Sequence, residues 1–489
     1  MEENIYTIER SAAWRETLRK SVKASERTRI ERVVMPAQAP DVRNRNNQEV
    51  NAGLSEEQAV REASRCLDCA NPTCVTGCPV GVHIPSFVKC IEARDFQGAA
   101  RVLKQTNTLP SVCGRVCPQE VQCESKCFYV QKMQKPAVAI GNLERFAADF
   151  ERLSGKAELP EKAPANGIKV AVVGSGPSGL AAAGDLIKNG YDVTVFEALH
   201  EIGGVLKYGI PEFRLPNAVV DSEIETLRRL GVRFETDFLV GKTATLGDLR
   251  AEGYKAFYIS SGAGLPNFMG IPGENLIGVF SSNEYLTRVN LMGAASDERD
   301  TPILRGRTVM VVGGGNTAMD SVRTAKRMGA EKAMIVYRRS MDEMPARKEE
   351  IQHAMEEGIE FNCLLNPVEC LADEKGHVKQ VRVQKMELGE PDASGRRRPQ
   401  PIAGSEYLID VDLVIMSIGV SPNPLIPRSV EGLAISRKGT IEVDPETMQS
   451  SIPDIFAGGD IVRGGATVIL AMGDGRRGAA GVMKYLSQK

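Results

Sequence analysis

Hydrophobic and polar positions follow a repeating pattern over the last two thirds of this chain. From about residue 168 onward, short runs rich in β-branched residues end in glycine-rich turns and are followed by segments with helical spacing. This order is typical of parallel β-α-β units. Two such units are predicted, beginning at Ile168 and at Thr308, and the stretch from Glu387 to Ser405 is predicted to be a solvated hairpin excursion between two strands.

The first third of the chain has a different texture. Residues 1–50 are polar and are expected to form an arm of helix and coil that packs on a larger body. Ser55 followed by Gln58 is a capping-box pattern, which predicts the start of a short helix. A helical stretch is also predicted over residues 85–107, between two groups of cysteines. The segment 154–167 contains prolines and glycines and is the predicted linker to the β-α-β units.

Composition and charge exclude several classes of protein. A chain of 489 residues is long enough for two to four domains at about 100 to 200 residues each. The 61 Lys and Arg residues nearly balance the 63 Asp and Glu residues, which disfavours binding to nucleic acid or to an anionic membrane. No apolar run approaches the roughly 18 residues of a membrane helix, and residues 1–4 lack the order of a secretory signal. The expected location is the cytoplasm.

Eight of the eleven cysteines form two closely spaced groups. In a cytosolic protein such groups indicate metal or redox chemistry rather than disulfides. Four nearby thiolates with a proline after the last are typical of iron–sulfur ligation, whereas zinc sites usually use two separated pairs, so zinc is the less favoured alternative. We expect two [4Fe-4S] clusters, and spacing alone leaves open which thiolate binds which cluster. The groups are Cys66, Cys69, Cys74 and Cys78, and Cys113, Cys117, Cys123 and Cys127. Cys90, Cys363 and Cys370 stand apart and are expected to be inert buried thiols.

The first β-α-β unit carries a dinucleotide-binding loop. A predicted strand over residues 168–173 runs into the pattern G-x-G-x-x-G and then into a predicted helix. Such glycines allow a tight turn and the close approach of a pyrophosphate, which the helix N-terminus favours. The next strand ends in an acid placed to bind ribose hydroxyls, which suits an adenosine without a 2′-phosphate. The expected binding residues are Gly174, Gly176, Pro177, Ser178, Gly179 and Glu197.

The end of the chain indicates that this nucleotide is FAD. Residues 447–460 have the pattern of a strand found in flavoproteins with two dinucleotide domains. That strand ends in an Asp that lies near the ribityl and phosphate region of the flavin nucleotide. Gly459 and Asp460 occupy that place, and a helix predicted to start near Thr467 and Val468 can point at the isoalloxazine ring. The FAD domain is then split, with the second unit inserted in it.

The second unit carries its own glycine loop, with features that favour NADPH. The strand from Thr308 is followed by G-x-G-x-x-A, and the next strand ends in two arginines instead of an acid. An acid would repel a 2′-phosphate, whereas Arg makes charge-assisted contacts with it. Arg347 and Lys348 lie near in sequence and are expected to add positive potential. The expected binding residues are Gly313, Gly315, Asn316, Thr317, Ala318, Arg338 and Arg339.

Taken together, these motifs resemble the small (beta) subunits of NADPH-dependent glutamate synthase over nearly the whole chain. The resemblance extends to the large subunit of NADH-dependent ferredoxin:NADP oxidoreductase and to the amino-terminal half of dihydropyrimidine dehydrogenase. It is carried by the segments 66–69, 77–80, 106–110, 113–119, 140–145, 203–211, 337–339, 344–347 and 457–460. It implies an α/β fold in which a helical, ferredoxin-like domain with two [4Fe-4S] clusters precedes two Rossmann-like domains of the adrenodoxin and glutathione reductase type, the second inserted in the first. The expected parts are an arm (1–50), the iron–sulfur domain (51–153), the linker (154–167), the FAD domain (168–300 and 436–489) and the NADPH domain (301–435).

The same resemblance implies particular ligands. One cluster is held, in the family, by residues matching Cys66, Cys69, Cys74 and Cys127. The other is held by those matching Cys78, Cys117 and Cys123, with a carboxylate or amide ligand at the position of Glu144. Cys113 is then not a ligand, although counting would have included it. Gly204, in the matching segment 203–211, is expected to contact the flavin nucleotide.

The resemblance implies an NADPH-oxidising electron-transfer subunit. Hydride would pass from NADPH to FAD and electrons would pass through the clusters to a partner subunit that makes L-glutamate from glutamine and 2-oxoglutarate. The chain has no room for those further sites, so a large (alpha) subunit is the expected partner. The alternative is the large subunit of a bifurcating ferredoxin:NADP oxidoreductase, with a small FAD/[2Fe-2S] partner, or the electron-input subunit of a pyrimidine-reducing system. Hydride transfer requires no acid–base side chain, so no catalytic residue is expected.

Overall fold

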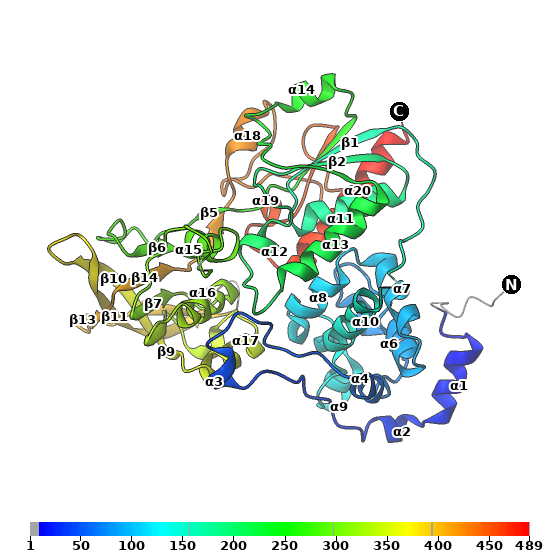
Figure 1. Cartoon of the computed structure of the whole chain (residues 1–489), viewed down its shortest axis with the longest axis horizontal. Helices are drawn as coiled ribbons and strands as arrows, with labels where there is room; N and C mark the ends of the chain where they lie inside the picture. The colour runs from blue at the N-terminus through cyan, green and yellow to red at the C-terminus, as the bar shows by residue number, and fades with distance from the viewer. Residues whose placement is uncertain (1–8, 156, 297, 393–394, 489) are drawn as a thin grey trace.

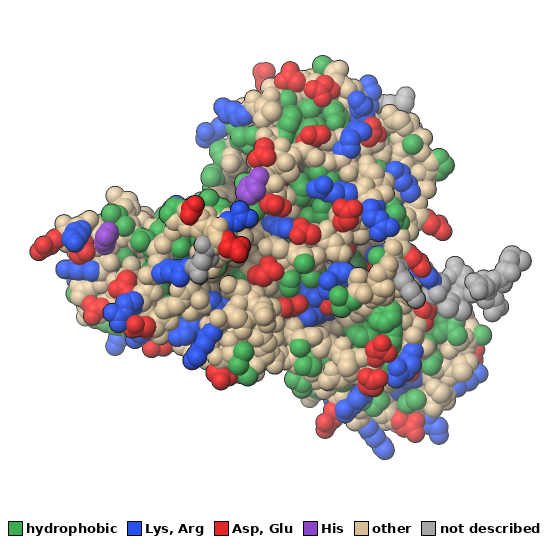
Figure 2. All heavy atoms as spheres, viewed as in Figure 1, with side chains coloured by type: hydrophobic (Ala, Val, Ile, Leu, Met, Phe, Trp, Pro, Cys, Tyr) green, Lys and Arg blue, Asp and Glu red, His purple; other side chains and the backbone are tan. Residues whose placement is uncertain are grey.

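The computed structural model describes residues 9–155, 157–296, 298–392 and 395–488. The prediction that residues 1–4 do not begin a secretory signal concerns residues outside these ranges. Figure 1 shows three lobes, which we call the helical lobe, the first sheet unit around β1 and the second sheet unit around β7. On the face seen in Figure 2, basic and acidic side chains are interspersed, in keeping with a net charge of −2. Among the described residues, no helix combines the length and apolar character needed to cross a membrane.

Short helices make up the helical lobe. The capping box at Ser55 is present, since its hydroxyl accepts from Gln58 N at 3.2 Å and α4 begins there. The predicted helix over residues 85–107 is divided, because Arg94 has a positive φ of 61° and Asp95 caps a new helix by accepting from Gly98 N. The elements are α1 (Ala13–Ser21), α2 (Ala24–Arg27), α3 (Pro40–Arg43), α4 (Glu56–Ala63), α5 (Thr73–Thr76), α6 (Ile84–Glu92), α7 (Phe96–Thr106), α8 (Pro110–Val116), η1 (Gln119–Val121), η2 (Glu124–Lys126), α9 (Phe128–Met133) and α10 (Ile140–Ser154).

The first sheet unit is built on a parallel sheet with strand order β16-β4-β1-β2-β3. Strand β16 comes from near the end of the chain and pairs with β4, so the chain returns to its first sheet after building the second. This confirms the predicted insertion. The elements are β1 (Lys169–Val173), α11 (Pro177–Lys188), β2 (Asp192–Phe196), α12 (Val205–Tyr208), α13 (Asn217–Leu230), β3 (Arg233–Glu235), α14 (Leu246–Ala251), β4 (Ala256–Ile259), α18 (Leu425–Ser429), β16 (Ile455–Ala457), α19 (Asp460–Arg463) and α20 (Val468–Leu486).

The second sheet unit has a parallel sheet of order β6-β14-β7-β8-β9 and an attached antiparallel sheet. Strands β11 and β12 pair antiparallel, which confirms the predicted hairpin excursion. The elements are β6 (Val279–Ser281), α15 (Ser282–Asn290), β7 (Thr308–Val312), α16 (Asn316–Arg327), β8 (Lys332–Tyr337), η3 (Met341–Glu343), α17 (Lys348–Glu356), β9 (Glu360–Cys363), β10 (Leu365–Ala372), β11 (Val378–Pro391), β12 (Arg397–Pro401), β13 (Tyr407–Asp410) and β14 (Leu413–Met416).

The three lobes are joined in two different ways. One apolar core runs without interruption from the helical lobe into the first sheet unit. The second sheet unit has apolar cores of its own. The chain crosses to it and back through a short antiparallel ribbon, formed by β5 (Leu265–Pro266) and β15 (Val420–Ser421). The helical lobe and the first sheet unit therefore share hydrophobic packing that the second sheet unit does not join.

Candidate functional site: a shared dinucleotide cleft beside the cysteine loops

A single cleft of about 1840 Å³ lies between the two sheet units. Pockets for one small ligand are typically about 300 to 1,000 Å³, so this volume suits two dinucleotides. The carboxyl ends of parallel strands from both sheets open into it, as expected for ligand sites in such folds. The predicted residues that line it are Gly174, Gly176, Pro177, Ser178, Glu197, Gly204, Gly313, Gly315, Asn316, Thr317, Arg338, Arg339, Gly459, Asp460, Thr467 and Val468, whereas Gly179 and Ala318 lie behind the loops.

The three glycines of the first loop have three different surroundings. Gly174 turns with a φ of 101°, and a Cβ there would lie 2.5 Å from the Ser260 carbonyl oxygen. A Cβ on Gly179 would lie 2.0 Å from the Gly174 carbonyl oxygen, so helix α11 can pack this closely only without a side chain. A Cβ on Gly176 would meet nothing within 4 Å. The open backbone at Gly176 faces the cleft, where a pyrophosphate fits.

Glu197 at the end of β2 holds the first loop in shape. Its carboxylate accepts from Ser175 N at 2.9 Å and from Ser175 Oγ at 2.5 Å, and from Leu199 N at 2.9 Å. The Ser175 hydroxyl oxygen in turn accepts from Gly203 N at 2.9 Å. The acid that is expected to bind the ribose is therefore also the anchor of the glycine loop.

The end of the chain closes over the same loop. Gly459 has a φ of 78°, and a Cβ there would lie 2.9 Å from the Ser178 Cβ. Asp460 starts α19 and accepts from Ala466 N at 3.1 Å, while burial raises the pKa of its carboxyl to about 6. Thr467 caps α20, whose N-terminus borders the cleft. These residues come together with the first glycine loop as the sequence predicts.

The second loop repeats the arrangement of the first. Gly313 has a φ of 142°, and a Cβ there would lie 2.2 Å from the Ser417 carbonyl oxygen. Gly315 again has an open side, with nothing within 4 Å of a Cβ. Ala318 is fully buried, so its methyl group is accommodated where the first loop has a third glycine. Asn316 Oδ1 accepts from Arg347 N at 2.9 Å, which fixes the loop to the start of α17.

The two arginines after β8 have different surroundings. Arg339 is buried, with its Nη2 2.7 Å from Asp392 Oδ2 and its Nε donating to the Arg397 carbonyl at 2.8 Å, so it holds the β11–β12 hairpin. Arg338 is exposed in the cleft, and its guanidinium has no ionic partner among the residues described. Arg396, within the stretch expected to be solvated loop, lines the cleft as well. Arg396 is half-exposed and lies in the loop between β11 and β12, so the loop of this hairpin borders the cleft at that residue.

Arg347 also differs from expectation, because it does not face the cleft. Its side chain is buried against the helical lobe, where Nη1 donates to the Arg115 carbonyl and Nη2 to Gln119 Oε1, both at 2.9 Å. The neighbouring Lys348 donates its backbone N–H to Glu120 Oε1 at 3.2 Å. These residues connect the second sheet unit to the loop that carries Cys117.

The first predicted cluster set comes together around Cys74. Burial raises the pKa of the Cys74 thiol, and the nearby Cys66, Cys127 and Cys69 groups raise it further. Burial also raises the pKa of the Cys66 thiol to about 11. Buried thiols this close together are stable in their ionised form only beside positive charge, which the iron ions of a cluster provide. The four residues therefore fit a [4Fe-4S] group.

The second predicted set comes together next to the first. A hydrogen bond with Cys113 and burial raise the pKa of the Cys117 thiol, and nearby Glu144 and Cys123 raise it further. Burial raises the pKa of the Cys78 thiol to about 11, with Glu144 adding to the effect. Burial likewise raises the pKa of Glu144 to about 8. A buried carboxylate is favoured here only beside a positive charge, so this set also fits iron.

Cys113 lies in the second set as well. Its Sγ is 3.6 Å from Asn107 Oδ1, and Asn107 Nδ2 donates to Glu144 Oε1 at 2.7 Å. Among the described residues, no three such side chains meet closely enough for a single metal ion. The choice between Glu144 and Cys113 as the fourth ligand stays a prediction.

The cysteine loop reaches the cleft directly. Val116 and Pro118, on either side of Cys117, both line it. On the same loop, Gln122 Nε2 lies 3.5 Å from Thr467 Oγ1 at the start of α20. A cluster bound through Cys117 would thus lie beside the nucleotide-binding space.

Several cleft residues were missed by sequence reasoning. Ser260 and Gly262 follow β4, and the rule that ligands bind at the carboxyl ends of parallel strands could have found them. Tyr208, Arg214 and Asp320 also line the cleft. Tyr208 belongs to the matching segment 203–211, whereas no short motif signals Arg214 or Asp320.

Two family models match successive parts of the chain. Residues 43–156 match the family model described as dihydropyrimidine dehydrogenase domain II, 4Fe-4S cluster, and residues 168–475 match pyridine nucleotide-disulphide oxidoreductase. The glutamate synthase [NADPH] small chain of Escherichia coli K12 is 38% identical over 94% of this chain and 98% of its own length. That of Azospirillum brasilense is 36% identical over 93% and 95%. The solved structure of Mycobacterium tuberculosis FprA in complex with NADPH has 20% identity and a TM-score of 0.55, covering 66% of this chain and 85% of its own, and it supports the fold.

Proposed function

Because this chain belongs to the family of NADPH-type glutamate synthase small chains, we propose that it is the NADPH-oxidising, electron-transferring subunit of a glutamate synthase. Bound at the two glycine loops and the cysteines, FAD, NADPH and the [4Fe-4S] clusters would supply hydride and single-electron transfer chemistry toward a site where glutamine and 2-oxoglutarate give L-glutamate. No acid–base side chain is assigned, because the protein contributes binding, orientation and exclusion of water. The similarity to glutamate synthase small chains favours this function over the bifurcating alternative.

One observation carries this proposal. A single cleft contains a glycine loop followed by an acid, a glycine loop followed by an exposed arginine, and the residues on both sides of Cys117. The binding sites of both nucleotides and the loop of the Cys117 cluster therefore border the same cleft. Gly176 and Gly315 leave their backbones open to the two pyrophosphates, while Arg338 has its guanidinium available for a 2′-phosphate.

We assign the remaining roles as follows. Glu197 binds the adenosine ribose of FAD, and Asp460 with the start of α20 binds its ribityl and ring portion. The clusters use Cys66, Cys69, Cys74 and Cys127, and Cys78, Cys117, Cys123 and Glu144. The relatives are small chains, so a partner subunit completes the reaction, and we propose a glutamate synthase large chain for this role. All eleven cysteines are unpaired, which supports a reducing compartment such as the cytoplasm.

The test begins with the anaerobically purified chain, reconstituted with FAD, iron and sulfide. Addition of NADPH should bleach the flavin absorbance, and NADH should do so much more slowly. In the complex that co-purifies from cells, NADPH oxidation should require both glutamine and 2-oxoglutarate and should yield glutamate. A complex that binds both substrates without oxidising NADPH would contradict the proposal. Co-purification with a small flavoprotein that links NADH and ferredoxin would point to the bifurcating alternative instead.

A further inference from the structure

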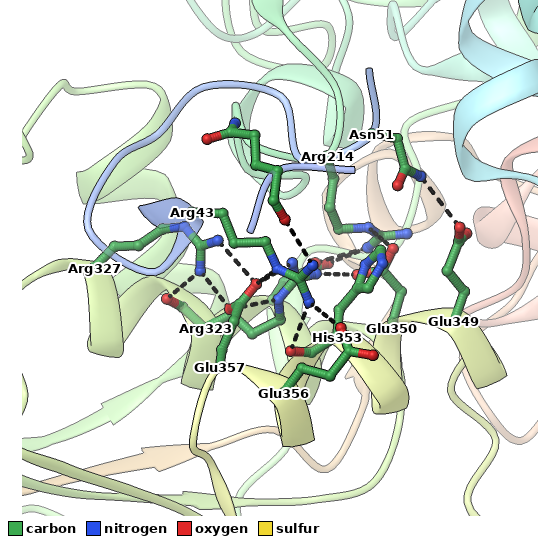
Figure 3. Close-up of polar contacts among 12 residues, drawn as sticks. Arg43, Asn51, Arg214, Arg323, Arg327, Glu349, Glu350, His353, Glu356 and Glu357 are labelled. Carbon is green, nitrogen blue, oxygen red and sulfur yellow. Dashed lines mark hydrogen bonds and ion pairs between the residues drawn. The ribbon is translucent and has the colours of Figure 1, made fainter. Parts of the chain in front are cut away.

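A buried cluster of charges joins the second sheet unit to the rest of the molecule. We call it the charged junction, and Figure 3 shows most of its side chains converging between α17, the 38–51 loop and the segment that carries Arg214. Its members are Arg43, Arg214, Asp320, Arg323, Arg327, Glu350, Glu356 and Glu357.

Three guanidinium groups meet at Glu357. Arg43 Nε lies 3.0 Å from Glu357 Oε1, Arg323 Nη2 lies 2.7 Å from Oε1, and Arg327 Nη1 lies 2.8 Å from Oε2. The Glu357 side chain is fully buried, and Arg43 is 2% exposed. Arg43 also reaches Glu356 Oε2 at 2.7 Å. Since Arg43 belongs to the arm and the others to the second sheet unit, this contact attaches the arm to that unit.

The first sheet unit enters the junction through Phe213 and Arg214. The Phe213 ring lies under Arg327, 3.8 Å from its guanidinium carbon, and Phe213 O accepts from Val50 N in the arm at 2.9 Å. Arg214 Nη1 lies 2.7 Å from both carboxylate oxygens of Asp320, and its Nε lies 3.2 Å from Glu350 Oε1. Burial works against ionisation of Glu350, yet the Arg214 and Arg323 groups lower its pKa to about 2.

Asp320 connects the charged junction to the NADPH-binding loop. Asp320 lies on α16, which begins at Asn316 directly after the second glycine loop, and both Asp320 and Arg214 line the cleft. The Arg214–Asp320 pair thus connects the first sheet unit to the base of the NADPH loop. The apolar core shared by the helical lobe and the first sheet unit does not extend across this contact, because the second sheet unit has apolar cores of its own.

We propose that Arg214 is a positioning residue for hydride transfer: its pairing with Asp320 and Glu350 fixes the angle between the two sheet units, and the arm braces that pairing through Arg43. This inference rests on the proposed function. A guanidinium fork can hold two carboxylates in one geometry, whereas the single ammonium of Lys cannot. Misplacement of the reacting groups by about 1 Å costs on the order of a hundredfold in rate.

The experiment compares Arg214→Lys with Arg307→Lys in the reconstituted holoenzyme. Arg307 is a matched control, because its pair with Glu331 lies on the surface of the second sheet unit, with side chains 77% and 66% exposed. Arg214→Lys should keep the NADPH dissociation constant within about threefold while lowering the rate of flavin reduction at saturating NADPH by about tenfold to a hundredfold. Arg307→Lys should change neither quantity. A Lys variant that reduces flavin at the native rate would overturn the inference.

A double variant separates positioning from simple charge balance. Arg214→Met with Asp320→Asn removes both charges of the Arg214–Asp320 pair. The comparison is with Arg214→Met alone. If the double variant restores the stability lost in Arg214→Met but not the flavin-reduction rate, positioning is supported, and if it restores both, the inference is overturned.

Hydrogen exchange provides a readout independent of activity. Arg214→Gln should speed amide exchange in residues 313–320 and 38–51, and unchanged exchange there would refute the junction's role. A native chain that does not oxidise NADPH would refute only the proposed function, because exchange still tests the junction.

Discussion

Arg338 offers the most direct test of how the cleft selects its coenzyme. The side chain lies exposed at the end of β8 without an ionic partner among the described residues, so Arg338→Ala breaks no ion pair there and should leave the thermal midpoint unchanged. A hydrogen bond to a charged group is worth about 1.5 to 3 kcal/mol. An exposed site favours the lower end of this range, so loss of the 2′-phosphate contact should lower kcat/KM for NADPH by about tenfold and at most by about a hundredfold.

The assay is steady-state dye reduction with NADPH and with NADH. The ratio of the two kcat/KM values should shift toward NADH, because NADH has no 2′-phosphate to lose contact with. Arg382→Ala is the control, since Arg382 is a half-exposed arginine that pairs with Glu369 in the attached sheet, away from the cleft. Equal losses with both coenzymes would refute the reasoning, and so would an unchanged value for NADPH. Arg339→Ala should behave differently, destabilising the chain because the buried Arg339 side chain loses its ion pair with the half-buried Asp392.

Three further predictions concern the loops. Gly176→Ala should fold normally but bind FAD weakly, because the new methyl group enters open space in the cleft, whereas Gly174→Ala should fail to fold because its Cβ would meet backbone; soluble yield and bound flavin distinguish the two. Cys117→Ala should lose about half of the bound iron and Cys113→Ala almost none, as measured by iron analysis, and equal losses would show that the ligand assignment is wrong. Arg347→Gln should speed proteolysis of the 115–123 loop without changing flavin content, since two buried hydrogen bonds to that loop disappear.

The sequence predicts the local motifs of this molecule, such as the glycine loops, better than it predicts the contacts between distant segments. The glycine loops are predictable because each glycine answers a local steric need, as the crowded surroundings of Gly174 and Gly313 show. The return of the chain to its first sheet was expected because the segment ending in Asp460 has a recognisable form. Both features depend on residues that are near each other in the chain.

Contacts between distant segments were not predictable. Arg338 and Arg339 are adjacent and chemically identical, yet only the fold of the distant β11–β12 hairpin decides that Arg339 is used internally. Likewise, nothing near Arg347 in the sequence indicates that it faces Gln119, 228 positions away. Arginine is suited to surface, ligand and interior pairing alike, so its role depends on neighbours that only the tertiary structure supplies.

The ribbon of β5 and β15 has a consequence for how this architecture can be modified. Leu265 pairs with Ser421 and Pro266 with Val420, so the two ends of the inserted unit lie about 5 Å apart. A unit whose two ends are this close can be replaced by another without moving the chain ends of the first sheet unit apart. A replacement that binds another coenzyme would need to supply a matching pair of strand ends, acids placed to receive Arg43 and Arg214, and an arginine placed like Arg347. Recombination could thus change the electron donor while leaving the flavin and iron–sulfur machinery intact.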